Sequence, residues 1–141
     1  MPGFLLDTNV VSELTKGAPN PKVRAWIDSI DESLLYLSVL TIGEIRKGLA
    51  LLPRSARRTR YEAWLETDLR PRFAGRLLGI DLGLAERWGG LTAQAAKAHH
   101  RVPVIDGLLA ATAIHYNLTF ATRNADDVVH TGVPVFNPWH G

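Results

Sequence analysis

The chain has 141 residues, 46% of them hydrophobic and 21% charged, which is the balance of an ordinary globular domain. Its formal net charge of +2 excludes a uniformly basic or acidic chain, and the lack of cysteine excludes disulfide scaffolds, thiol nucleophiles and thiolate metal sites. No apolar run approaches the ~20 residues of a membrane span and no secretion signal is visible, so we expect one cytoplasmic domain over residues 1–141.

The N-terminal half of the chain predicts alternating strands and helices. Its first apolar run, Phe4-Leu5-Leu6, stops at the polar residues Asp7-Thr8-Asn9, which indicates a buried strand that leads into a helix. The pattern then predicts, in chain order, a helix to Leu14, a break at 17–21, a helix over 23–30, a strand over 34–39, a helix from Thr41 to near Pro53, and a basic helix over 55–68 that Arg70-Pro71-Arg72 interrupts.

The C-terminal half continues the same alternation. It predicts a strand at 77–81, a helix through 84–99, a buried alanine-rich helix at 108–114, and strands at 118–122 and 133–136. Because the strands alternate with helices and no Asn-Gly hairpin occurs, the sequence predicts an α/β fold. We expect a mostly parallel central sheet of about four to five strands flanked by helices.

Polar residues follow the predicted strands directly. Asp7 follows the first strand, Glu44 lies one turn into the helix after the second, Asp106 precedes the buried helix, and Asn124 and Asp127 follow the fourth strand. Because the carboxyl ends of parallel strands share one edge of a sheet, we expect these side chains to gather there.

Helix capping is the alternative explanation of these residues. Asp7, Asp106 and Asn124 are suitable N-caps, and Thr41-x-x-Glu44 has the form of a capping box. Capping, however, needs only a short polar side chain, and so does not explain acids after three different strands. Crowded carboxylates repel one another unless a cation lies among them, and Mg²⁺ prefers oxygen ligands. The pattern therefore favours a metal site that hydrolyses phosphodiesters by metal-activated water.

Four segments resemble the motifs of PIN-domain ribonucleases, and in particular those of VapC-type toxins of toxin–antitoxin pairs. They are LLDTNVVSEL, TIGEIRKGL, IDGLLAATAI and FATRNADDV, in the order and spacing of that family. The ending VFNPWHG is similar to the tail of the FitB-like branch. The resemblance covers nearly the whole chain.

The resemblance implies a role for each matching residue. Asp7 and Asp106 are expected to ligate Mg²⁺, or Mn²⁺ in its place, with Glu44 completing the acidic pocket. Asn124 stands where the family often has Asp and brings no charge. Asp127 stands where many relatives carry an acid before an aromatic residue, but here Val128 replaces the aromatic residue. Because of these two departures from the family pattern, we expect one well-held ion.

The resemblance also implies partners. It implies metal-dependent cleavage of RNA to 5′-phosphate and 3′-hydroxyl ends, a homodimer, and an antitoxin whose C-terminal segment occludes the pocket. Thr122 is expected to hydrogen-bond an acid of the pocket. Arg123 is a candidate for binding a phosphate of the RNA, and Arg46 and Lys47 are candidates for binding either RNA or a carboxylate of a partner. The four tryptophans are expected to pack in the core or at an interface.

Positive charge is concentrated in the middle of the chain. Nine of the sixteen Lys and Arg residues, but three of the fourteen acids, lie between Arg46 and Arg76, which we call the basic arm. The basic arm is either a solvated helical face or a surface for phosphates or an acidic protein.

Other functions remain open to different degrees. An aspartyl-phosphate phosphatase needs a second acid where Asn9 stands, and no glycine-rich nucleotide-binding loop occurs. A PIN-like fold that lost catalysis and serves as a protein-binding module stays open, and Asn124 favours it. Asp7, Glu44 and Asp106 favour catalysis, because uncompensated acids destabilise a fold that binds no metal.

Overall fold

A parallel sheet of five strands forms the centre of the computed structural model, which describes residues 3–141. The strand order is β3-β2-β1-β4-β5, and every neighbouring pair is parallel. The strands are β1 (Phe4–Leu6), β2 (Leu35–Ser38), β3 (Leu77–Leu78), β4 (Thr119–Ala121) and β5 (Val135–Phe136). The predicted α/β class with a sheet of four to five strands is confirmed.

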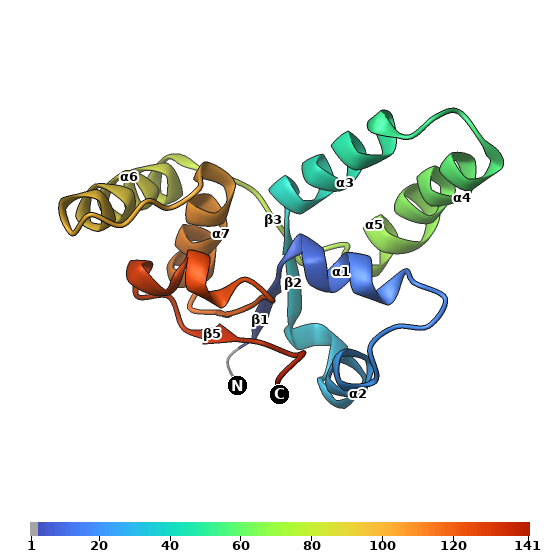
Figure 1. The fold of residues 1–141 in the computed structure, drawn as a ribbon, viewed down its shortest axis with the longest axis horizontal. Helices are drawn as coiled ribbons and strands as arrows, with labels where there is room; N and C mark the ends of the chain where they lie inside the picture. The colour runs from blue at the N-terminus through green and yellow to red at the C-terminus, as the bar shows by residue number, and fades with distance from the viewer. Residues whose placement is uncertain (1–2) are drawn as a thin grey trace.

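Helices make the crossovers that parallel strands require. They are, in chain order, α1 (Thr8–Leu14), α2 (Pro21–Ser29), the 3₁₀ turn η1 (Glu32–Leu34), α3 (Val39–Leu51), α4 (Ala56–Trp64), the π-helical η2 (Leu65–Leu69), α5 (Arg70–Arg72), α6 (Leu82–Lys97), α7 (Val104–His115), and the 3₁₀ turns η3 (Ala125–Asp127) and η4 (Val129–Thr131). Helices α1 to α5 lie on one side of the sheet and α6 and α7 on the other (Figure 1). No helix within residues 3–141 has the length and apolar character needed to cross a bilayer.

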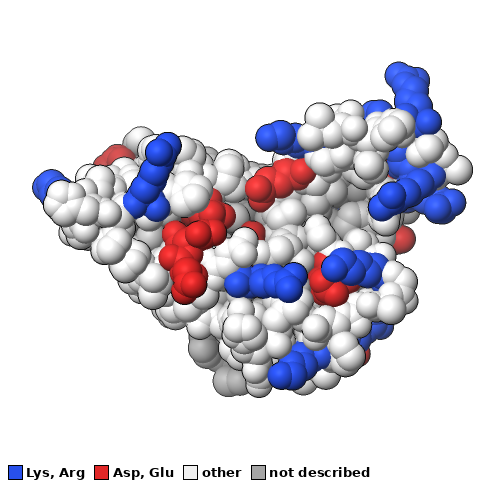
Figure 2. Space-filling view, viewed as in Figure 1, with Lys and Arg blue, Asp and Glu red and all other residues white. Residues whose placement is uncertain are grey.

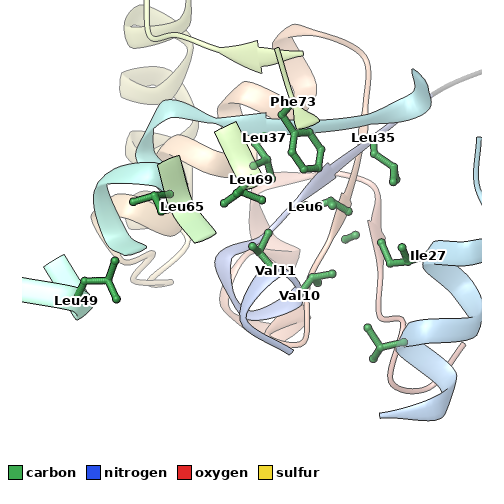
Figure 3. Packing of buried hydrophobic residues seen from close by; sticks show 12 residues of the cluster. Leu6, Val10, Val11, Ile27, Leu35, Leu37, Leu49, Leu65, Leu69 and Phe73 are labelled. Carbon is green, nitrogen blue, oxygen red and sulfur yellow. The ribbon is translucent and has the colours of Figure 1, made fainter. Parts of the chain in front are cut away.

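A separate hydrophobic cluster covers each face of the sheet, because successive side chains of a strand point to opposite faces. Leu6 of β1 packs in the first cluster with α1 and η2, whereas its neighbour Leu5 packs in the second with α7. Figure 3 shows Val10, Val11 and Leu69 of the first cluster around Leu6. Since both faces are covered, polar groups of the central strands are accessible only at the strand ends.

The predicted start of the helix after the second strand is wrong. Helix α3 begins at Val39 rather than Thr41, because the Ser38 hydroxyl caps it by accepting a hydrogen bond from the Leu40 backbone N–H at 3.0 Å. Thr41 is therefore buried inside the helix, and the predicted Thr41–Glu44 capping box does not form. Ser38 is also the last residue of β2, so strand and helix follow without a loop.

The basic arm stays helical where an interruption was predicted at Arg70-Pro71-Arg72. The chain passes through the π-helical turn η2, in which the Arg70 N–H bonds the Leu65 carbonyl five residues earlier. Pro71 then lies in the first turn of α5, where its missing N–H costs no helical hydrogen bond and its fixed φ suits the helix. The arm consequently folds back against α1 and the sheet rather than ending in a loop.

Candidate active site

Asp7 lies at the carboxyl end of β1, the middle strand of the sheet. Its backbone N–H bonds the Ala121 carbonyl at 2.9 Å, which extends the pairing of β1 with β4 by one residue. Its Oδ1 accepts the Thr8 backbone N–H at 2.7 Å and so caps α1. Asp7 therefore serves as a cap and also presents its other carboxylate oxygen at the sheet edge, with only 6% of its surface exposed.

Two side chains fix the second oxygen of Asp7. The Thr122 hydroxyl donates to Oδ2 at 2.7 Å, as the sequence predicted, and the Asn9 amide donates to the same atom at 3.3 Å. The Thr122 hydroxyl in turn accepts the Asn124 backbone N–H at 3.0 Å. Sequence reasoning gave Asn9 no such role, although its place two residues after Asp7 was the available signal.

Glu44 reaches the same edge from α3. The Thr8 hydroxyl donates to Glu44 Oε1 at 2.6 Å, which joins the start of α1 to the first turns of α3. Glu44 thus faces α1 instead of bonding back to the start of its own helix. Thr8 is a second residue whose part in the site the sequence reasoning missed.

Asp106 lies in the first turn of α7 and not at its cap. Pro103 occupies the N-cap position and makes no side-chain cap bond, so the capping explanation of Asp106 is wrong. The next residue, Gly107, lies against α6: a Cβ there would be 3.1 Å from Trp88 Nε1. The glycine permits the close approach of α6 and α7, which sets the position of Asp106.

Asn124 and Asp127 lie after β4, at the start and end of η3. The Asn124 side chain makes no cap hydrogen bond, so capping does not account for it either. Asp127 is close enough for its charge to raise the pKa values of both Asp7 and Asp106. Structure and sequence therefore agree that this loop brings one carboxylate to the site through Asp127.

The site carboxylates interact unfavourably. The pKa of Asp106 is raised to about 6, mainly by burial and further by the charges of Asp7, Asp127 and Glu44. Burial also raises the pKa of Asp7, although the hydrogen bonds from Thr122 and Thr8 oppose it. Within residues 3–141, none of the four acids forms an ion pair with a basic side chain. Figure 2 shows acidic side chains gathered along the hollow between the two halves of the molecule.

This arrangement fits a cation that the protein holds only in part. Among the described residues, no three acidic, His or Cys side chains lie close enough to enclose a metal ion by themselves. Mg²⁺, however, is commonly held by one or two carboxylates together with waters and substrate phosphates. Asp7 and Asp106, the acids with raised pKa values, are the side chains that fit such an ion.

The candidate RNA-binding residues have different surroundings. Arg46 pairs with Glu66, so its charge is already matched. Lys47 lines a groove of about 530 Å³ between α3 and Ile105 at the start of α7, and Glu44 lines the same groove. Arg123 follows Thr122 directly, and its backbone N–H bonds the Asn9 carbonyl oxygen Oδ1 at 3.4 Å. Lys47 thus shares a groove with Glu44, and the backbone of Arg123 contacts Asn9, which bonds Asp7.

Comparisons with known proteins agree with this geometry. The model of the PIN domain matches residues 4–131. The chain is 41% identical to the VapC ribonuclease Y4jK of Sinorhizobium fredii, covering 96% of this chain and 97% of that protein. It is 40% identical to the toxin FitB of Neisseria gonorrhoeae, covering 97% and 99%. The crystal structure of FitAcB from the same organism superposes with a TM-score of 0.94 at 39% identity, over 98% of this chain and 99% of that one. The fold, the strand-end acids and these similarities together show that the chain belongs to the PIN-domain family.

Proposed function

We propose that this protein is a metal-dependent endoribonuclease that acts as the toxin of a toxin–antitoxin pair. The observation that carries the proposal is a group of four acids at the carboxyl ends of β1 and β4 and the start of α3 and α7, none of which has a basic partner within the described residues 3–141. The names of the relatives, a VapC ribonuclease and a FitB toxin, support the same activity.

The residues of the site have different roles in the proposed reaction. Asp7 and Asp106 would hold Mg²⁺, or Mn²⁺, and the bound ion would supply an activated water and neutralise charge on the phosphate. Thr122 and Asn9 keep the Asp7 carboxylate in one orientation. Glu44, held by Thr8, and Asp127 increase the negative potential that attracts the cation. No side-chain nucleophile is needed, so the expected products carry 5′-phosphate and 3′-hydroxyl ends.

Asn124 contributes differently from an acid. Its amide oxygen can orient a water by hydrogen bonding but adds no charge. We therefore propose a single well-held ion, and we expect Asn124→Ala to slow cleavage less than replacement of Asp7 or Asp106.

The proposed protein partners are an antitoxin and a second copy of the chain. The solved structures of FitAB and FitAcB are similar over nearly the whole chain. A segment of an antitoxin lying in the groove between α3 and α7 would contact the exposed Val39 and Leu51 and cover Glu44. For a homodimer, the exposed Leu82 and Tyr116 offer apolar surface. The proposed place of action is the cytoplasm.

The test uses Asp7→Asn and Asp106→Asn. Each variant should fold, because Asn keeps the size of the side chain, but should lose detectable cleavage of single-stranded RNA in Mg²⁺ and lose toxicity in cells. Asp126→Asn is the matched control: this exposed neighbour of Asp127 has no part in the pKa shifts of Asp7 and Asp106, and its variant should cut at the wild-type rate. Cleavage by either site variant at the wild-type rate, or full activity in excess EDTA, would falsify the proposal.

The second candidate function is a protein-binding module without catalysis, which the Asn124 replacement favours. The same assay separates the two functions. A folded wild-type protein that binds its antitoxin but cuts no RNA in Mg²⁺ or Mn²⁺ would establish the binding module instead.

A further inference from the structure

The segment at the C-terminal end of the chain contacts the loop that follows β4. This segment, Asn137–Trp139, lies beyond residues 4–131, which the PIN-domain model matches. The Asn137 amide donates to the Arg123 carbonyl at 3.4 Å, and the Trp139 backbone N–H donates to Asn137 Oδ1 at 2.9 Å. Asn137 thus links Trp139 to Arg123, the residue between Thr122 and Asn124 of the site.

The Trp139 ring holds the Arg123 side chain. The guanidinium carbon of Arg123 lies 5.1 Å from the centroid of the indole ring, within the range of a cation–π interaction. The ring itself is partly buried against the first hydrophobic cluster, so its position is fixed by the core. The contact therefore restricts the rotamers of an exposed arginine whose backbone lies between Thr122 and Asn124 of the site.

The charges around Arg123 leave its donors free. Within residues 3–141, Arg123 has no carboxylate partner within 4.0 Å. The hydrogen bond from Lys16 is the main reason that the pKa of Glu13 is lowered, and the charge of Arg123 makes the smallest contribution to this effect. A guanidinium held by an aromatic face keeps its five N–H donors for another ligand, and bidentate binding of phosphate suits them.

We propose that Trp139 is a positioning residue, which holds Arg123 at the rim of the acidic site so that the guanidinium binds a phosphate of the RNA next to the one that is cut. The inference rests on the proposed ribonuclease function. It extends the site beyond the region matched by the PIN-domain model.

The experiment measures steady-state cleavage of a single-stranded RNA by the full chain. Arg123→Gln should raise KM about tenfold and change kcat much less, because it removes one charge-assisted contact with phosphate. Trp139→Leu should raise KM severalfold, and Trp139→Phe should restore most of the wild-type KM because the aromatic face remains. In the double variant, Trp139→Leu should add nothing to the effect of Arg123→Gln, since both remove the same interaction.

Trp26→Leu is the matched control. Trp26 is also a partly buried tryptophan of the first cluster, but it packs against Phe4 and Phe136. Its variant should lose a similar amount of thermal stability and keep the wild-type KM. An unchanged KM in Arg123→Gln, equal KM effects of Trp139→Leu and Trp26→Leu, or additive effects in the double variant would each overturn the inference.

A binding assay separates this inference from the proposed function. Fluorescence anisotropy with a labelled single-stranded RNA and the Asp7→Asn protein should show weaker binding when Arg123→Gln or Trp139→Leu is added. If the wild-type protein cuts RNA but neither substitution alters KM or anisotropy, only the role of Trp139 fails. If the wild-type protein neither cuts nor binds RNA, the proposed function fails and this inference fails with it.

Discussion

Acidic side chains in two regions of the molecule have opposite surroundings. Around the basic arm, Glu32 bonds Arg72 and Arg76, and Glu66 bonds Arg46 and Arg70. These hydrogen bonds, led by that of Arg72 for Glu32 and that of Arg46 for Glu66, lower the pKa values of both acids. At the sheet edge, burial raises the pKa values of Asp7 and Asp106.

The contrast shows which charges the fold satisfies internally. Five of the nine bases of the basic arm have carboxylate partners, so much of the arm's charge is matched within the protein. Within residues 3–141, the acids of the sheet edge lack such partners, although the sequence has sixteen basic residues. Unmatched buried charge costs stability, and such a cost is expected at the proposed metal site.

The largest effect on stability is expected from removing the Thr122 hydroxyl, which donates a hydrogen bond to Asp7. Thr122→Val removes the buried hydroxyl that bonds Asp7 and should lower the free energy of unfolding by about 2 kcal/mol, because the bond is to a charged group. It should also raise the pKa of Asp7 further and move the acidic limb of the activity profile to higher pH. Urea denaturation and pH-dependent rates measure the two effects.

Thr119→Val in β4, the strand that Thr122 follows, is the control for this substitution. Among the described residues the Thr119 side chain makes no hydrogen bond, so its replacement should change little. Equal effects at the two positions would contradict the importance assigned to the Thr122–Asp7 bond.

The next effect tests the unfavourable charge of Asp106 through pH. Between about pH 4 and 6 the folded protein holds a proton on Asp106 that the unfolded chain has released, so the free energy of unfolding falls as pH rises through this window. Asp106→Asn removes this loss. Without metal, the variant should be more stable than the wild type above pH 6 by about 1–2 kcal/mol, a value reduced for the partial exposure of Asp106, and the difference should vanish near pH 4. A variant that is less stable than the wild type at pH 7.5 would show that Asp106 is compensated within the protein.

Metal binding should relieve the same repulsion. At a Mg²⁺ concentration of about ten times its Kd, the wild-type protein should gain about 1.4 kcal/mol of stability, visible as a higher Tm. The Asp7→Asn/Asp106→Asn double variant should show no such gain, whereas Glu32→Gln should keep it. A gain of equal size in the double variant would place the ion elsewhere.

The smallest effect on stability is expected from replacing an acid that is paired with arginines. Glu32→Gln removes two ion pairs of a carboxylate that is 47% exposed, so it should cost less than about 1 kcal/mol and less still at high salt. Thermal melts at low and high ionic strength measure it. A larger and salt-insensitive loss would mean that Glu32 is as strongly coupled to the fold as the acids of the site.

The sequence was sufficient for the architecture and for the gathering of the acids. Apolar runs that stop at Asp7 and before Asn124 indicated parallel strands, and parallel strands bring their carboxyl ends to one edge. The order of the strands could not be read in the same way, because it depends on which faces of the helices pack together. The resemblance to the PIN-domain family supplied the expected metal ligands and the ribonuclease activity, which the periodicity of apolar residues alone did not indicate.

The details that the sequence did not predict depend on neighbours distant in the chain. Whether Ser38 or Thr41 caps α3 depends on where β2 ends, and both residues suit the role equally. Pro71 normally ends a helix, but the π-helical turn before it absorbs the change in hydrogen bonding. The contact between Trp139 and Arg123 joins two loops whose spacing carries no periodic signal.

The central position of β1 determines when the site assembles during synthesis of the chain. Thr122, the hydrogen-bond partner of Asp7, is synthesised 115 residues after it, and β1 is unpaired on one side until β4 has been made. Domains fold as units once their long-range contacts are available. A chain whose translation stops before β4 therefore lacks the assembled acids, and under the proposed function such a product would not cut RNA.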